Sequence, residues 1–212
     1  MSKETAQQNS VGVVLIGLPK TGKTALACQF CDQPAPTEYN ATTIDTPMDT
    51  TLTIGKAMYN FTFNDCSGSA LLNSRTTANT ILSKGKIHIF VVSPTESDSA
   101  EYIQGFFKDL TKDSEPIYRF VFVTHKEQED KDGVVASLKD FIPDDCKIYQ
   151  YDVLNQKDEI VNNFTDFMKR ALVEHKELFE GCLATEKPKK AQPADSAKQG
   201  DAPKKKKACL IF

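Results

Sequence analysis

The stretch GLPKTGKT, residues 17–24, follows directly on the apolar run VGVVLI of residues 11–16. Two glycines that flank a short loop, followed by Lys and Thr, form the pattern of a phosphate-binding loop. In such a loop the backbone N–H groups point at the phosphates of a nucleotide, and the next helix offers its N-terminus to the same anion. The stretch therefore predicts a strand, a loop and a helix that together hold a polyphosphate.

Each residue of this loop has an expected role. Gly17 permits the sharp turn after the strand, and Gly22 lets the backbone curl around the phosphates. Lys23 is expected to reach the β- and γ-phosphates, and the hydroxyl of Thr24 to ligate Mg²⁺. Lys20 adds a cation that either contacts phosphate or lies in solvent. The residues here that we expect to line the nucleotide are Gly17, Lys20, Thr21, Gly22, Lys23, Thr24 and Ala25.

A second element with metal-binding character follows at residues 61–68, FTFNDCSG. Asp65 comes at the end of a predicted strand, where its carboxylate can hold the water shell of a phosphate-bound metal. Gly68 can offer its backbone N–H to a γ-phosphate. Read alone, DCSG is also the pattern of a turn after a strand. Its combination with the loop at residues 17–24 favours a site for a nucleotide and Mg²⁺.

The rest of the chain alternates between apolar runs with strand character and helical patterns. The runs at 86–92 and 117–124 are nearly continuous in hydrophobicity, as in strands buried on both faces of a parallel sheet. Residues 50–54 and 58–63 flank Gly55-Lys56 and alternate, which predicts a hairpin. We expect an α/β fold of the P-loop type, a three-layer sandwich with a mixed, mostly parallel six-stranded sheet flanked by about five helices. The remaining elements are expected at 11–16 and 147–151 (strands) and at about 22–31, 70–83, 97–112, 133–141 and 157–180 (helices).

Length and composition fit one well-buried domain with a short appendage. The chain has 212 residues, of which 40% are hydrophobic and 26% charged. No run approaches the roughly 18 apolar residues of a membrane span, and the polar start MSKETAQQNS is no secretory signal. Six widely spaced cysteines fit a reducing cytosol. We expect a flexible segment at 1–10, a domain at 11–181 and a disordered basic tail at 182–212.

The tail has the features of a membrane anchor. Residues 187–212 contain eight lysines and two aspartates, a net charge of +6, which leaves −9 for residues 1–186 within the total of −3. The chain closes on Cys209-Leu210-Ile211-Phe212, a prenylation pattern whose terminal Phe favours geranylgeranyl. Lys204 to Lys207 precede it, and a lipid plus a polybasic stretch suffices for anchoring to an anionic surface. The alternatives for the lysines are a solvated tail or nuclear import.

We therefore expect the protein at the cytoplasmic face of a cellular membrane, with a cytosolic pool and without a nucleic-acid partner.

With these motifs, residues 11 to about 180 resemble a small GTPase of the Ras superfamily. GLPKTGKT is similar to that family's phosphate loop, and DCSG to its metal-binding Asp-x-x-Gly element. The resemblance implies GTP and GDP as ligands, with Mg²⁺ held by Thr24, Asp65 and a threonine of the first switch. The segment ATTIDTP places Thr43 in that role, and Thr42 would be a slip of one residue. Effector, activator and exchange proteins are the implied partners.

The resemblance is weaker at the end that would bind the base. After IYRFVFV the family places Asn-Lys-x-Asp, whose Asp reads the N1 and N2 donors of guanine. Here the stretch is THKEQ, and alignment on the lysine puts His125, Lys126 and Gln128 in these roles. A slip of one would put Thr124 and Glu127 there. Gln128 offers one acceptor group and one donor where a carboxylate accepts from two donors, which implies weak guanine selectivity or weak nucleotide binding.

The catalytic position also differs from the family. The Gln that orients the attacking water is replaced by Ser69, whose shorter side chain reaches less far. Catalysis would rest on positioning and on charge neutralisation by Lys23, Mg²⁺ and the loop amides. We expect a membrane-anchored switch that hydrolyses GTP slowly. The same departures fit a catalytically inactive interaction module, and the lost guanine reader would fit an ATP-using enzyme, although no arginine-rich lid insertion is present.

Overall fold

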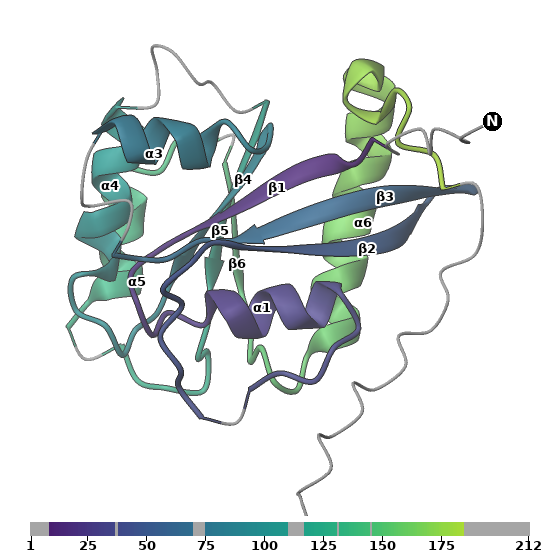
Figure 1. Ribbon diagram of the computed structural model, residues 1–212. Helices are drawn as coiled ribbons and strands as arrows, with labels where there is room; N and C mark the ends of the chain where they lie inside the picture. The colour runs from purple at the N-terminus through teal and green to yellow at the C-terminus, as the bar shows by residue number, and fades with distance from the viewer. Residues whose placement is uncertain are drawn as a thin grey trace, which may run out of the picture.

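The computed structural model describes residues 9–36, 38–69, 75–109, 117–130, 132–144 and 146–184. Strands and helices alternate along this part of the chain, as the sequence pattern predicts (Figure 1). The strands are β1 (Val11–Ile16), β2 (Thr46–Ile54), β3 (Ala57–Asp65), β4 (Ile87–Val92), β5 (Tyr118–Val123) and β6 (Lys147–Gln150). The α-helices are α1 (Lys23–Phe30), α3 (Arg75–Leu82), α4 (Ser99–Asp109), α5 (Val134–Ser137) and α6 (Lys157–Glu174), with 3₁₀ turns at Leu138–Asp140 and Lys176–Phe179.

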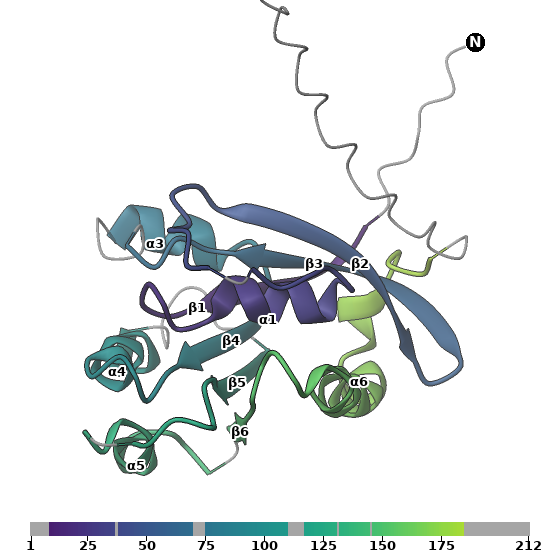
Figure 2. The same cartoon turned by 90° about the horizontal axis from the view of Figure 1, so that it is seen from below.

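The six strands form one sheet in the order β2-β3-β1-β4-β5-β6. All neighbours are parallel except the β2–β3 hairpin, which is antiparallel. Figure 2 shows α6 on one side of the sheet and α3, α4 and α5 on the other. The predicted three-layer sandwich with a mixed, mostly parallel sheet is therefore confirmed.

Aromatic side chains fill the space between the sheet and the layer of α1 and α6. Phe30 of α1 stacks on Phe63 of β3 with 4.4 Å between ring centroids, and Phe164 of α6 lies 5.8 Å from Phe61. These positions follow the alternation along β3, which turns every second side chain toward the same face. The opposite face packs aliphatic residues of β1, β4 and β5 against α3, α4 and α5, with Phe90 against Phe107 at 4.4 Å.

The hairpin and two helices differ from the prediction in their bounds. β2 begins at Thr46 and β3 ends at Asp65, so the hairpin is longer than predicted from residues 50–54 and 58–63. The part of β2 that the prediction missed begins with Thr46 and Pro47, which are exposed at the edge of the sheet. Apolar and polar residues do not alternate there, so the sequence pattern does not indicate a strand. The helix expected at 133–141 is a short α5 followed by a 3₁₀ turn.

The predicted single helix over 157–180 is wrong at its end. α6 stops at Glu174, and His175 takes φ −134° and ψ 62°, outside the helical region. The 3₁₀ turn that follows brings Phe179 to within 5.2 Å of Tyr59, ring centroid to centroid, and leaves it 3% exposed. Burial of this aromatic ring against β3 explains why the chain turns back rather than continuing the helix.

The contacts of the domain continue past residue 181, where we expected the tail to begin. Cys182 is buried, the N–H of Asn60 donates to its carbonyl, and Leu183 forms an isolated bridge with Tyr59. Residues 182–184 thus lie against the start of β3. Residues 1–8 and 185–212, with the expected flexible start and the lysine-rich tail, lie outside the described residues. None of the described helices is long and apolar enough to cross a membrane.

We expect Gly12→Ala to destabilise the fold by about 2–4 kcal/mol. A Cβ at Gly12 would lie 2.4 Å from the carbonyl oxygen of Lys84 and 2.8 Å from the Cα of Gly85. Both neighbours are backbone atoms, so β1 would have to move away from the turn that precedes β4. Urea unfolding measures the effect.

Gly105→Ala is the matched control. Gly105 lies within α4, and a Cβ there would meet nothing within 4 Å. It should stabilise the protein by about 0.5–1 kcal/mol because Ala loses less backbone entropy in a helix. Equal urea midpoints for Gly12→Ala and the unmodified protein would contradict the close approach of β1 and this turn.

Candidate functional site

A cavity of about 320 Å³ opens where the phosphate loop, the segment before β2 and the ends of β3, β5 and β6 meet. The carboxyl ends of parallel strands are where ligands bind in open α/β sheets. Of the predicted site residues, those that line the cavity are Lys20, Gly22, Lys23, Thr24, Ala25, Thr43, Gly68, Ser69 and His125. Gly17, Thr21, Asp65, Lys126 and Gln128 are not among its lining residues.

Lys23 is the central cation of this cavity. It is the first residue of α1 and is 6% exposed, and among the described residues it is the one buried lysine or arginine. Its ammonium donates hydrogen bonds to the carbonyls of Gly17 (3.0 Å) and Leu18 (2.7 Å), which hold it against the loop. Burial lowers the pKa of Lys23 from 10.5 to about 8, while the negative charge of Asp65 acts in the opposite direction. An anion in the cavity would therefore meet a desolvated cation that gains from its charge.

Thr24 and Asp65 form the expected pair beside this lysine. The Thr24 hydroxyl donates to Oδ2 of Asp65 at 2.7 Å, across 41 positions of sequence. Asp65 is 2% exposed, and its other oxygen, Oδ1, is buried without a hydrogen-bond partner among the described residues. Burial raises the pKa of the Asp65 carboxyl, against the hydrogen bond from Thr24 and the charge of Lys23, which lower it.

This arrangement fits a hard divalent cation. Mg²⁺ prefers oxygen ligands, and it commonly binds through one or two protein groups plus phosphate oxygens and waters. The unpartnered Oδ1 of Asp65 and the hydroxyl of Thr24 supply such groups. Within the described ranges no group of three or more His, Cys, Asp or Glu residues could hold a metal ion.

The structure brings Thr42 rather than Thr43 to this pair. The Thr42 hydroxyl lies 3.2 Å from that of Thr24 and donates to Asp65 Oδ2 at 3.4 Å. Thr43 also lines the cavity but is exposed, whereas Thr42 is half-buried. The geometry favours the alternative of a one-residue slip, because the hydroxyl of Thr42 contacts both Thr24 and Asp65.

The segment after Asp65 packs directly on the phosphate loop. A Cβ at Gly68 would lie 2.6 Å from the backbone nitrogen of Pro19, so only glycine allows this approach. The hydroxyl of Tyr102 donates to the carbonyl of Gly68 at 3.0 Å and fixes the peptide from the α4 side. Ser69 lies in the cavity wall, with its hydroxyl 3.1 Å from that of Ser67.

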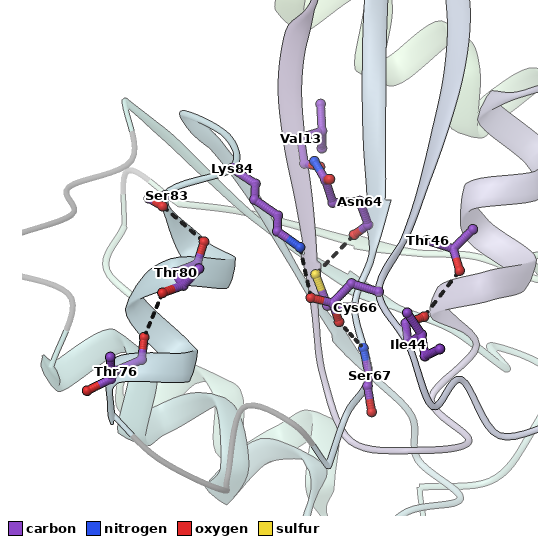
Figure 3. A network of polar contacts seen from close by, with 11 residues as sticks. Val13, Ile44, Thr46, Asn64, Cys66, Ser67, Thr76, Thr80, Ser83 and Lys84 are labelled. Carbon is purple, nitrogen blue, oxygen red and sulfur yellow. Dashed lines mark hydrogen bonds and ion pairs between the residues drawn. The ribbon is translucent and has the colours of Figure 1, made fainter.

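A carboxylate that the sequence analysis missed connects the two segments around the cavity. Asp45, three residues after Thr42, accepts hydrogen bonds from the backbone N–H of Ser67 and from the ammonium of Lys84, both at 3.0 Å. Figure 3 shows the side chains of Ser67 and Lys84 near each other, with the Cys66 thiol between them donating to the carbonyl of Asn64. The Asp45 side chain therefore links the segment before β2 to the segment after β3. No local pattern marks Asp45, because its partners lie 22 and 39 positions away.

The far end of the cavity is built from the loop after β5. The Thr124 hydroxyl donates to the carbonyl of Thr21 at 2.8 Å, which ties this loop to the phosphate loop. His125 has a positive φ of 51°, and its Nδ1 lies 2.9 Å from Ser93 Oγ and 3.1 Å from Thr124 Oγ1. The imidazole is thus fixed in the cavity wall. Sequence reasoning did not find Ser93, which lies at the end of β4.

Glu127 reaches the cavity, whereas Lys126 and Gln128 do not line it. Across the cavity lie Asp152, Val153 and Leu154. The carboxylate of Asp152 is already engaged, because it accepts hydrogen bonds from the backbone of Leu154 and from the side-chain amide of Asn155. At this end Glu127 is therefore the carboxylate available to a ligand with paired donors, and the geometry favours the one-residue slip here too.

Fold, loop and cavity define the class: this is a nucleotide-binding protein with a phosphate-binding loop at the start of α1. The model of the Ras family matches residues 12–174, more than half of the chain. The protein therefore belongs to the Ras family and is a small GTPase in the general sense of that family. A comparison with the curated proteins finds no match.

Proposed function

We propose that this protein is a membrane-anchored, Ras-like switch that binds GTP and GDP with Mg²⁺ and hydrolyses GTP slowly. The observation that carries the proposal is the cluster of Lys23, Thr24 and Asp65, with the unpartnered Oδ1 of Asp65 beside a buried ammonium. Lys23 would bind the β- and γ-phosphates, and Thr24, Asp65 and Thr42 would hold Mg²⁺. The metal would neutralise phosphate charge when bound.

Ser69 is the reason to expect slow hydrolysis. It lies in the cavity wall where the family has a longer amide side chain, and its hydroxyl can hydrogen-bond to Ser67. A serine extends too short a distance to orient a water in line with a terminal phosphate while resting on that wall. Stabilisation of the developing charge would fall to Lys23 and to the amides of the phosphate loop.

The second candidate function is an interaction module of the same fold without turnover. Ser69 favours it, together with the absence of the family's Asn-Lys-x-Asp sequence after β5. In that case Asp45, which links the segments on either side of the cavity, would hold one fixed surface for a partner.

One experiment separates these functions. The purified protein is denatured and the released nucleotide identified, the exchange of GDP for GTP is followed with and without EDTA, and single-turnover GTP hydrolysis is measured. Bound GDP whose release is accelerated by EDTA, with slow but measurable hydrolysis, supports the switch. Absence of any nucleotide, or of hydrolysis over hours with candidate activators, supports the module. Stoichiometric ADP would indicate an ATP-using enzyme.

Membrane anchoring rests on the last residues of the chain, and we expect Cys209→Ser to move the protein from membranes to the soluble fraction. Without the thiol no prenyl chain can be attached, and the lysines alone bind anionic lipid weakly and reversibly. Fractionation of cells that express each form measures the change. Phe212→Ser is the matched control, because it keeps Cys209 and should retain membrane binding with a different prenyl group. An unchanged distribution for Cys209→Ser would rule out the anchor.

A further inference from the structure

Lys20 occupies an unusual place in the phosphate loop. Its side chain lines the cavity, and its φ is +66°, in the left-handed region that side chains disfavour. Among the described residues only Lys20, Asp32 and His125 combine a side chain with positive φ, and Lys20 and His125 both line this cavity. Strained backbone of this kind gathers at functional sites, which directs attention to what the Lys20 side chain contacts.

The ammonium of Lys20 lies over the ring of Tyr39, with 5.9 Å between Nζ and the ring centroid. This distance is within the range of a cation–π interaction, in which the face of the ring attracts the positive charge. Tyr39 also lines the cavity and belongs to the segment that brings Thr42 to Asp65. The contact therefore holds a cation at the cavity and connects the phosphate loop to that segment.

The charged residues of the cavity wall indicate what the ammonium of Lys20 could bind. Lys20 and Lys23 are the lysines of its wall, whereas Glu38, Glu127 and Asp152 bring negative charge. None of the ion pairs between described residues involves Lys20, so its charge is available to a ligand. The carboxylate of Asp65 offsets part of the positive charge that Lys23 and one divalent metal ion supply, so part of the negative charge of a bound nucleoside diphosphate or triphosphate is left without a counter-charge.

We propose that Lys20 is a second phosphate-binding cation that slows nucleotide release, and that the Tyr39 ring positions its ammonium. This inference rests on the proposed function, since it needs a nucleotide in the cavity. The inference adds to the proposed function a role in retaining the nucleotide. It assigns this role to Lys20 of the phosphate loop and to Tyr39 of the segment before β2.

The test is the rate at which mant-GDP leaves the full-length protein, followed by direct excitation of the mant group in the presence of Mg²⁺. We expect Lys20→Ala to release mant-GDP at least about fivefold faster and Lys20→Glu faster still, because attraction to phosphate is lost and then reversed. Tyr39→Leu should accelerate release and Tyr39→Phe should not, since phenylalanine keeps the ring. Combined with Lys20→Ala, Tyr39→Leu should add little, as expected for two residues in one interaction.

The controls separate this inference from the proposed function. Lys56→Ala removes an exposed lysine from the β2–β3 turn and should leave the release rate unchanged. Thermal unfolding of every variant checks the fold. If the unmodified protein binds mant-GDP but Lys20→Ala and Lys20→Glu release it within twofold of the normal rate, the role of Lys20 is wrong and the switch stands. If the unmodified protein binds no mant-GDP or mant-GTP, both proposals fail.

Discussion

Lys23→Met is expected to weaken GDP binding by at least about a hundredfold, a factor that corresponds to roughly 3 kcal/mol. Methionine keeps most of the length and apolar volume of the lysine stem, so the start of α1 should stay packed. The lost group is the buried ammonium that the carbonyls of Gly17 and Leu18 hold at the loop. Isothermal titration with GDP and Mg²⁺ measures the change.

The pH dependence of binding gives the same prediction a second readout. Because the pKa of Lys23 is lowered to about 8, the free protein loses this charge as the pH rises above 8. GDP affinity should then fall by up to about tenfold per pH unit, since the bound phosphates require the charged form. In Lys23→Met this part of the pH dependence should disappear.

Stability without nucleotide should change with pH in the opposite sense. Lys23 in the unfolded chain keeps its proton up to its ordinary pKa of 10.5, whereas the folded protein loses it above about 8. Between these values the unfolded state binds more protons, so the free energy of unfolding should rise with pH across this window. Lys23→Met should lack that rise in urea titrations at pH 8 to 10.

Lys56→Met serves as the control for both readouts, because Lys56 is exposed in the β2–β3 turn. GDP binding by Lys23→Met within threefold of normal would show that the cavity does not bind phosphate through this residue. The switch proposal would then lose its main support.

Glu127→Gln is expected to lower GDP affinity by about tenfold to a hundredfold and to reduce the preference for guanine over xanthine. Guanine presents two N–H donors on one edge, which a carboxylate can accept together. Xanthine has a carbonyl in place of the amino group, and an amide can donate to it while accepting from the remaining N–H. The ratio of GDP to XDP dissociation constants measures the change directly.

Gln128→Ala is the matched control for base recognition. Gln128 aligns with the guanine-reading position of the family but does not line the cavity, so its removal should change the ratio little. A large loss of guanine preference in Gln128→Ala, with none in Glu127→Gln, would restore the alignment on Lys126. Glu127 would then line the cavity without recognising the base.

Local patterns in the sequence determined the elements of the fold. The buried strands β4 and β5, the alternation along β3 and the loop between Gly17 and Thr24 are properties of neighbouring residues, because the strand period of two and the turn preferences of glycine act within a few positions. Thr24 and Asp65 were predictable for the same reason, since Thr24 belongs to the loop motif after β1 and Asp65 ends β3. Their contact confirms that the two motifs converge.

Only the tertiary structure decided which of two adjacent residues makes the contact that the sequence analysis assigned to its neighbour. Thr42 rather than Thr43 meets Thr24, and Glu127 rather than Gln128 reaches the base end. The positive φ of His125 changes the direction in which the following side chains point. No periodicity in the sequence predicts this backbone conformation. The same holds for Asp45, whose bonds to Ser67 and Lys84 depend on how β2, β3 and α3 pack. Such contacts are long-range in sequence, so packing free energy rather than local preference selects them.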